Sequence, residues 1–172
     1  PQAGAMLAPF RDVGTPMVDT WTTMSPAGLI EIHMDPPGPV PASGDTAILE
    51  DLDAAGIDAF LAAIDPDVVT PLLMAELRQL GGALGRTPQG AGARDRFEGA
   101  FLLFAAGMPV TPEVTAALHE RLAHVVAAMR PWSTGTVYLN FAEGGGEAAN
   151  AYGDGVYARL RAVRGAGDPQ ER

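Results

Sequence analysis

The stretch Thr111–Met129, TPEVTAALHERLAHVVAAM, carries the strongest secondary-structure signal in the sequence. Thr111 suits an N-cap, and Pro112 suits the first helical position, where a missing amide hydrogen costs least. The apolar residues recur at helical spacing and form one stripe, made by Val114, Leu118, Leu122, Val125 and Met129. The spacing predicts the longest helix of the chain over 112–129, with its apolar stripe on a core.

The segment that follows this helix, TGTVYLNFAEGGG, alternates apolar and polar residues. Successive side chains of a strand point to opposite faces, so an apolar face would pack on the helix layer and a polar face would point away. The pattern predicts a strand over 136–141, with Tyr138 and Asn140 on the second face. From the pattern alone, these two are either plain edge and surface residues or functional ones.

Weaker signals on the N-terminal side complete the set of elements. Strands are predicted in TAILEDL, VVTPLLMAELRQL and GAFLLFAAG, the last two of them buried. Helices are predicted in AGAMLAPFRDVG, SPAGLIEIHM, DAAGIDAFLAAI with Asp53 as its cap, and GDGVYARLRAVRGAG. Proline-rich DPPGPVPASGD is expected to be a loop, and glycine-rich EGGGEAANAYGDG a flexible turn.

This order of elements predicts the fold class. Helices alternate with strands, and two strands follow each other across a Gly/Pro-containing connection, which suits an α+β fold. We expect a mainly antiparallel β-sheet with helices packed on one face, in a single domain over 1–172. A doubly wound parallel fold is the alternative.

Composition excludes several classes of function. The net charge of −10 disfavours nucleic acid and membrane surfaces as partners. No apolar run approaches the roughly 20 residues of a spanning helix, and no signal peptide is visible, so we expect a soluble, cytoplasmic protein. Cysteine and lysine are both absent, which excludes thiolate nucleophiles, Schiff-base chemistry and a Walker-type phosphate loop.

No metal site is predicted. The sequence HERLAH places His119 and His124 five residues apart, which is about 140° around a helix. They cannot share a metal ion from one helix face. No pair of acidic residues has the spacing of a carboxylate acid/base couple.

The C-terminal sequence YLNFAEGGGEAANAYGDGVYARLRAVRGAGDP resembles the signature of the berberine bridge enzyme-like FAD-linked oxidases. In that family Y-x-N-[FY] is followed by a Tyr-Gly pair, an Arg-Leu pair and a terminal Asp-Pro. Here these are Tyr138, Asn140 and Phe141, then Tyr152-Gly153, Arg159-Leu160 and Asp168-Pro169. The stretches APFRDVGTPMVDTW, HMDPP and AELRQLGGALGR resemble parts of the substrate domain of actinobacterial members.

The resemblance implies roles for Tyr138 and Asn140, and the needs of such a base point to two further residues. Tyr138 is the expected catalytic base, which takes a hydroxyl proton while hydride leaves to the flavin, and Asn140 is expected to lie near the cofactor. An ordinary phenol has a pKa near 10, so such a base needs a neighbouring positive charge or hydrogen bonds. Arg78, two residues from Glu76 and on the same strand face, is the cation we expect there. Glu76 and Arg78 are therefore predicted to bind substrate.

The resemblance also implies that the chain is the C-terminal part of a substrate domain, in an oxidase of alcohol or sugar hydroxyl groups. The FAD-binding domain is absent, so we expect no tightly bound FAD and little activity in the chain alone. Its expected partners are that domain, from the same polypeptide or another chain, a small-molecule substrate, and a second copy in a homodimer. Asp95-Arg96 replaces the family's usual His-Arg, and Arg86 stands where plant members carry a carboxylate, so amine oxidation is not expected. The alternative function is a free-standing, non-catalytic binding or dimerisation module.

Overall fold

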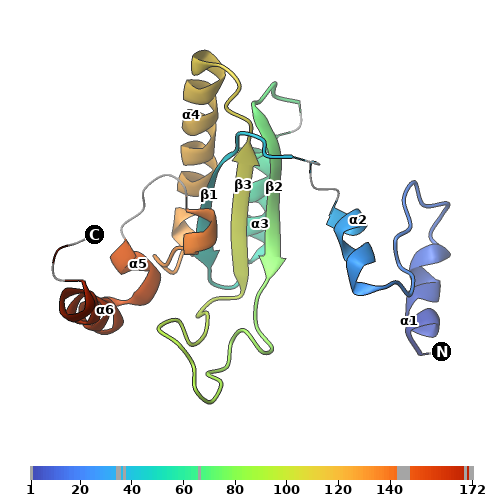
Figure 1. Ribbon diagram of the computed structural model, residues 1–172. Helices are drawn as coiled ribbons and strands as arrows, with labels where there is room; N and C mark the ends of the chain where they lie inside the picture. The colour runs from blue at the N-terminus through green and yellow to red at the C-terminus, as the bar shows by residue number, and fades with distance from the viewer. Residues whose placement is uncertain are drawn as a thin grey trace. The chain divides into compact units, whose positions relative to one another are not determined.

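The computed structural model describes residues 2–33, 36, 38–65, 67–142, 148–168 and 170 (Figure 1). Contacts divide the chain into two units, Pro1–Pro39 and Val40–Arg172. The single domain expected from the sequence stays a prediction.

Unit 1 contains the predicted helices at the start of the chain. They are α1 (Gln2–Arg11), the short 3-10 helix η1 (Pro26–Gly28) and α2 (Leu29–His33). Arg11 donates to the Asp19 carboxylate at 2.8 Å, and the ring of Phe10 meets that of Trp21 edge to face. None of the described residues of this unit is buried, so these contacts do not make a core.

Unit 2 is built on a three-stranded antiparallel sheet, visible in Figure 1. Its strands are β1 (Ser43–Leu49), β2 (Leu72–Gln79) and β3 (Phe101–Gly107), in the order β1-β3-β2. Both pairings with the central strand β3 are antiparallel. The α+β prediction is therefore confirmed, and the parallel alternative is wrong for the sheet described.

Two helices, α3 (Ala54–Ala63) and α4 (Pro112–Ala128), pack on one face of this sheet. Both begin at the predicted caps: Asp53 accepts from the Gly56 amide at 2.8 Å, and Thr111 accepts from the Val114 amide at 3.3 Å. The longest described helix is α4, as predicted. The core between helices and sheet is formed by Ala47, Leu49, Phe60, Ala63, Leu103, Ala105, Leu118, Leu122, Val125 and Met129.

The predicted strand over 136–141 is wrong. After η2 (Arg130–Trp132), the backbone runs beside β1 only as far as Thr136, whose carbonyl accepts from the Ile48 amide at 3.0 Å. The next amide, that of Val137, bonds instead to a carbonyl of the following helix, and the chain leaves the sheet. It then closes into the 3-10 helix η3 (Leu139–Phe141). Contacts with the C-terminal helices override the alternating pattern here.

The edge strand β2 differs from its expected burial. Its side chains are largely half-buried or exposed, and Leu73 is 70% exposed, because β2 has a neighbour in the sheet on one side only. Central β3 is buried as predicted.

The chain closes with α5 (Ala148–Tyr152) and α6 (Asp154–Gly167). The sequence predicted the second of these helices and placed a turn where the first lies. The first part of that expected turn, 143–147, lies outside the described residues. Within the described part of the chain, no helix is long and apolar enough to cross a membrane.

Candidate functional site

The site is built on the sheet face opposite α3 and α4. Cross-strand partners share a face, and Glu76 pairs with Phe104 while Arg78 pairs with Leu102. Arg78 donates from Nε to Glu76 Oε1 at 2.6 Å, so the two lie on one strand face, as predicted. Both side chains therefore belong to the face away from the helix core.

The helix η3 covers this face. The ring of Phe141 stacks on that of Phe104 at a centroid distance of 4.2 Å, and the guanidinium carbon of Arg78 lies 5.1 Å from the Phe141 centroid. Arg78 is thus held between a carboxylate and an aromatic face. It contacts Phe141 rather than Tyr138 among the interactions described.

Tyr138 and Asn140 are brought together by the turn into η3. The Asn140 side-chain amide donates to the Tyr138 hydroxyl oxygen at 3.3 Å. The Tyr138 ring lies 5.0 Å from that of Phe141 and 5.3 Å from that of Phe97, measured between centroids. A strand would have kept Tyr138 and Phe141 on opposite faces, so the turn places an aromatic cluster around the phenol.

A cavity of about 140 Å³ opens beside this phenol. Its lining residues come from three segments: Arg94 and Phe97 from the connection before β3, residues 137–140, and Ala151 and Tyr152 from α5. Arg94 lies over the rings of Phe97 and Tyr152, 5.4 and 6.0 Å from their centroids. The cavity is therefore lined by aromatic rings, two of them phenols, and by one guanidinium.

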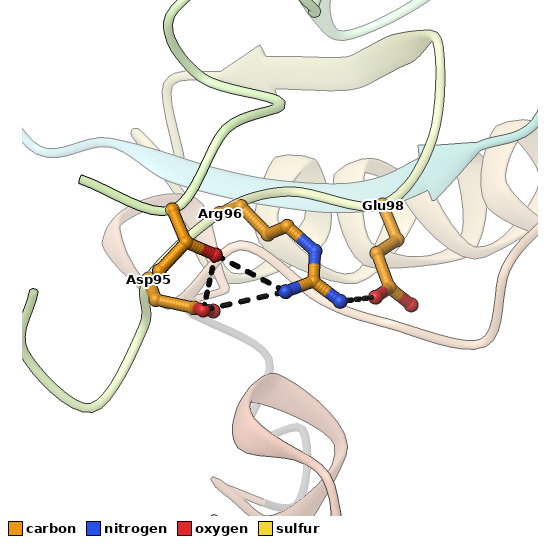
Figure 2. Close-up of polar contacts among 4 residues, drawn as sticks. Asp95, Arg96 and Glu98 are labelled. Carbon is orange, nitrogen blue, oxygen red and sulfur yellow. Dashed lines mark hydrogen bonds and ion pairs between the residues drawn. The ribbon is translucent and has the colours of Figure 1, made fainter.

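The connection that carries Arg94 is braced by a polar network (Figure 2). Thr87 donates to Asp95 at 2.6 Å, and Arg96 donates to Thr87 at 3.2 Å and forms ion pairs with Asp95 and Glu98. The Thr87 hydrogen bond, with the charge of Arg96, lowers the pKa of Asp95 below its usual value. Asp95 and Arg96 thus hold the loop together.

A second cavity, of about 630 Å³, lies between this connection and α6. Asp95 lines it on the loop side, and Arg159 and Leu160 line it on the helix side. Its charged groups are few, and its walls are mostly small or apolar residues. It adjoins the braced loop and does not include Tyr138.

Arg94 is the site residue that sequence reasoning missed. The sequence RDRF offers two arginines two residues apart, and the resemblance singled out the second of them, Arg96. The ion pairs occupy Arg96, whereas Arg94 lines the Tyr138 cavity. No group of three or more metal-ligating side chains gathers anywhere in the described ranges.

The residues present fit one edge of a flavin ring. Carbonyl oxygens and ring nitrogens at that edge need hydrogen-bond donors, and Asn140 and Arg94 supply N–H groups at the cavity. A cavity of about 140 Å³ accommodates a ring edge or a small substrate, not a whole dinucleotide.

No model of a protein family matches the sequence, and no curated protein matches it. Solved structures that share its fold include Physcomitrella patens BBE-like 1 as wild type and as a variant, each with a TM-score of 0.68 and 16% sequence identity. The match covers 82% of this chain and 30% of the BBE-like chain, so the chain spans about a third of that protein's length. The chain has the fold of part of a BBE-like protein.

Proposed function

We propose that this chain is the substrate-domain portion of an FAD-dependent oxidase that acts on alcohol or sugar hydroxyl groups. One observation carries the proposal. In a chain with a BBE-like fold, Tyr138 lines a small cavity, and its phenol oxygen accepts a hydrogen bond from the side-chain amide of Asn140. A phenol, a guanidinium and an aromatic lining are suited to bind a small hydroxyl compound and to take its proton.

In this proposal the phenolate form of Tyr138 receives the proton of the substrate hydroxyl and becomes the neutral phenol. The Asn140 amide donates to the phenol oxygen and fixes its position at the cavity. A bound flavin would supply the acceptor for the hydride that leaves the carbon atom bearing that hydroxyl. The substrate loses one proton and one hydride, and a carbonyl is formed.

Glu76 and Arg78 have a supporting role here. Their ion pair lies on the sheet face under η3, and Arg78 stacks on Phe141, which in turn packs against Tyr138. We assign them to the wall that holds the aromatic cluster and the outer part of the substrate. Their contribution is therefore to orientation rather than to proton transfer.

The test uses the complete polypeptide that contains this chain and a flavin domain. Under anaerobic conditions, a panel of alcohols and sugars is mixed with the flavoprotein, and bleaching of the flavin absorbance is followed. Reduction by at least one compound of this class is expected. A flavin that no hydroxyl compound reduces, or a parent polypeptide without bound flavin, would support the non-catalytic module instead.

The isolated chain of 172 residues is expected to bind FAD only weakly, because the expected pyrophosphate-binding half belongs to the FAD domain. Titration of FAD with the chain, followed by flavin fluorescence, checks this. A dissociation constant in the nanomolar range would contradict it.

A further inference from the structure

The guanidinium of Arg94 has a buried nitrogen that lacks a partner. Its Nη2 atom is buried from solvent and forms no hydrogen bond within the part of the chain that the structure describes. Its guanidinium carbon lies 5.4 Å from the Phe97 ring centroid and 6.0 Å from that of Tyr152, and these cation–π contacts supply no hydrogen-bond acceptor for its N–H groups. Nη2 itself is enclosed by its neighbours, but Nε and Nη1 are not, and no described hydrogen bond uses them, so an acceptor at the cavity reaches Arg94 through these groups.

An arginine side chain cannot relieve this arrangement by losing its proton. It stays charged in proteins, and a half-buried charge such as that of Arg94 is favoured by an anionic hydrogen-bond partner. The group that matches a guanidinium best is a planar anion with two oxygens, because a carboxylate accepts two parallel N–H bonds from it. The Arg94 guanidinium at the wall of this cavity therefore suits a carboxylate that arrives with a ligand.

The cavity limits the size and character of that ligand. Its volume of about 140 Å³ is close to that of a cavity of about 150 Å³ that holds benzene. Phe97, Leu139 and Tyr152 give it an apolar lining, and exposed Asn140 marks its opening to the surface. A compact carboxylate with an apolar body fits these walls.

We propose that the Tyr138 cavity binds the carboxylate of a small substrate through Arg94, so that the substrate class is small hydroxy acids or acidic sugars. This inference rests on the proposed function, because it names the substrate of the same site. Arg94 would anchor the acid end and leave the hydroxyl end at the Tyr138 oxygen. The same N–H groups also match the polar edge of a flavin ring, and the experiment separates these two sources.

The test is a binding titration on the 172-residue chain by NMR, with no flavin and no turnover. Benzoate is the probe, benzamide is its neutral counterpart of the same shape, and lumiflavin represents the ring edge without a phosphate. The variants are Arg94→Met, which removes the charge, and Arg94→Lys, which keeps it. Arg161→Met serves as the matched control, since Arg161 is exposed on α6 and does not line the cavity.

Benzoate is expected to shift the signals of residues 137–140 with an affinity at least tenfold higher than that of benzamide. Arg94→Met should abolish this preference, Arg94→Lys should retain part of it, and Arg161→Met should leave it unchanged. Equal affinity for benzoate and benzamide, or a preference that survives Arg94→Met, would overturn the inference. Lumiflavin binding that depends on Arg94, without binding of benzoate, would assign Arg94 to the cofactor and likewise overturn it.

If Arg94→Met does not fold, the comparison of benzoate with benzamide on the unchanged chain still decides the question. The titration is also independent of catalysis. A preference for benzoate in the chain, together with a complete polypeptide whose flavin no hydroxyl compound reduces, would reject the proposed function and keep the carboxylate site. Flavin reduction in the complete polypeptide, together with equal affinity of the chain for benzoate and benzamide, would reject the carboxylate site and keep the proposed function.

Discussion

Asp45 is a partly buried carboxyl whose titration is expected to affect stability. Burial raises its pKa above the ordinary value of 3.8, and the hydrogen bond from the Thr46 amide offsets this only in part. Compared with the unfolded state, the folded state therefore favours the protonated form of the Asp45 carboxyl. Its contribution to stability is fully present below about pH 3.8 and is lost as the pH rises through the folded-state pKa.

Asp45→Asn should accordingly stabilise the chain at neutral pH, because the amide keeps an acceptor for the Thr46 amide and carries no charge to desolvate. Thermal melting of both proteins between pH 3 and pH 7 checks this. The melting temperature of the variant should exceed that of the unchanged chain at pH 7, and the difference should shrink toward pH 3. A difference that stays constant with pH would contradict the role of ionisation.

At the residue scale, the sequence predicts types of side chain better than their partners. Tyr138 and Asn140 were singled out by a resemblance, and they do meet in the structure. Arg78 was chosen as the neighbouring cation because it shares a strand face with Glu76, and that local relation holds. The cation at the Tyr138 cavity is Arg94, which is 44 residues from Tyr138 in the sequence, and no periodicity within one element reports such a contact.

At the element scale, the segments with local signals were predicted and the segment held by tertiary contacts was not. Capping by Asp53 and Thr111 and the apolar stripe of α4 depend on neighbours within a few residues. The stretch 136–141 depends instead on α5 and on ring stacking with Phe104, which turn an alternating pattern into a 3-10 helix. The sequence pattern likewise does not show that β2 lies at an edge of the sheet, because the burial of a strand depends on the number of its neighbours in the folded chain.

A substitution at Gly107, the last residue of β3, tests how closely α4 packs on the sheet. A Cβ atom at this position would lie 2.5 Å from the Pro71 carbonyl oxygen and 2.6 Å from Leu118 Cδ1. Because one of these neighbours is backbone, Gly107→Ala should reduce the free energy of unfolding by about 1–3 kcal/mol. Gly92→Ala is the control, since no atom lies within 4 Å of its Cβ position, and it should change stability by less than about 0.5 kcal/mol.

Urea unfolding of the two variants gives the comparison. A loss of stability in Gly107→Ala that is no larger than in Gly92→Ala would show that α4 yields easily, and would contradict close packing at this end of the sheet.

At the scale of the whole molecule, the exposed edge strand bears on association. The free edge of β2 presents unpaired backbone groups and apolar side chains such as Leu73, which is the usual template for pairing with another strand. We expect two copies of the chain to pair through β2 with two-fold symmetry. A lysine at this edge should oppose such pairing.

Light scattering over a wide range of protein concentration tests this expectation. The unchanged chain should approach the mass of a dimer, and Leu73→Lys should stay closer to the monomer. A strictly monomeric mass for the unchanged chain at every concentration would reject the dimer.

The central claim is that this chain supplies the proton acceptor of a flavin-dependent oxidation. The most direct measurement is the rate of anaerobic flavin reduction by substrate in the complete flavoprotein, compared between the unchanged protein and Tyr138→Phe, with thermal melting of both. The hydrogen bond lost is a single contact at 3.3 Å between side chains at the surface, so stability should change by less than about 1 kcal/mol. The account predicts reduction slowed by about 10² or more with nearly unchanged melting. Reduction at an unchanged rate in Tyr138→Phe would contradict it.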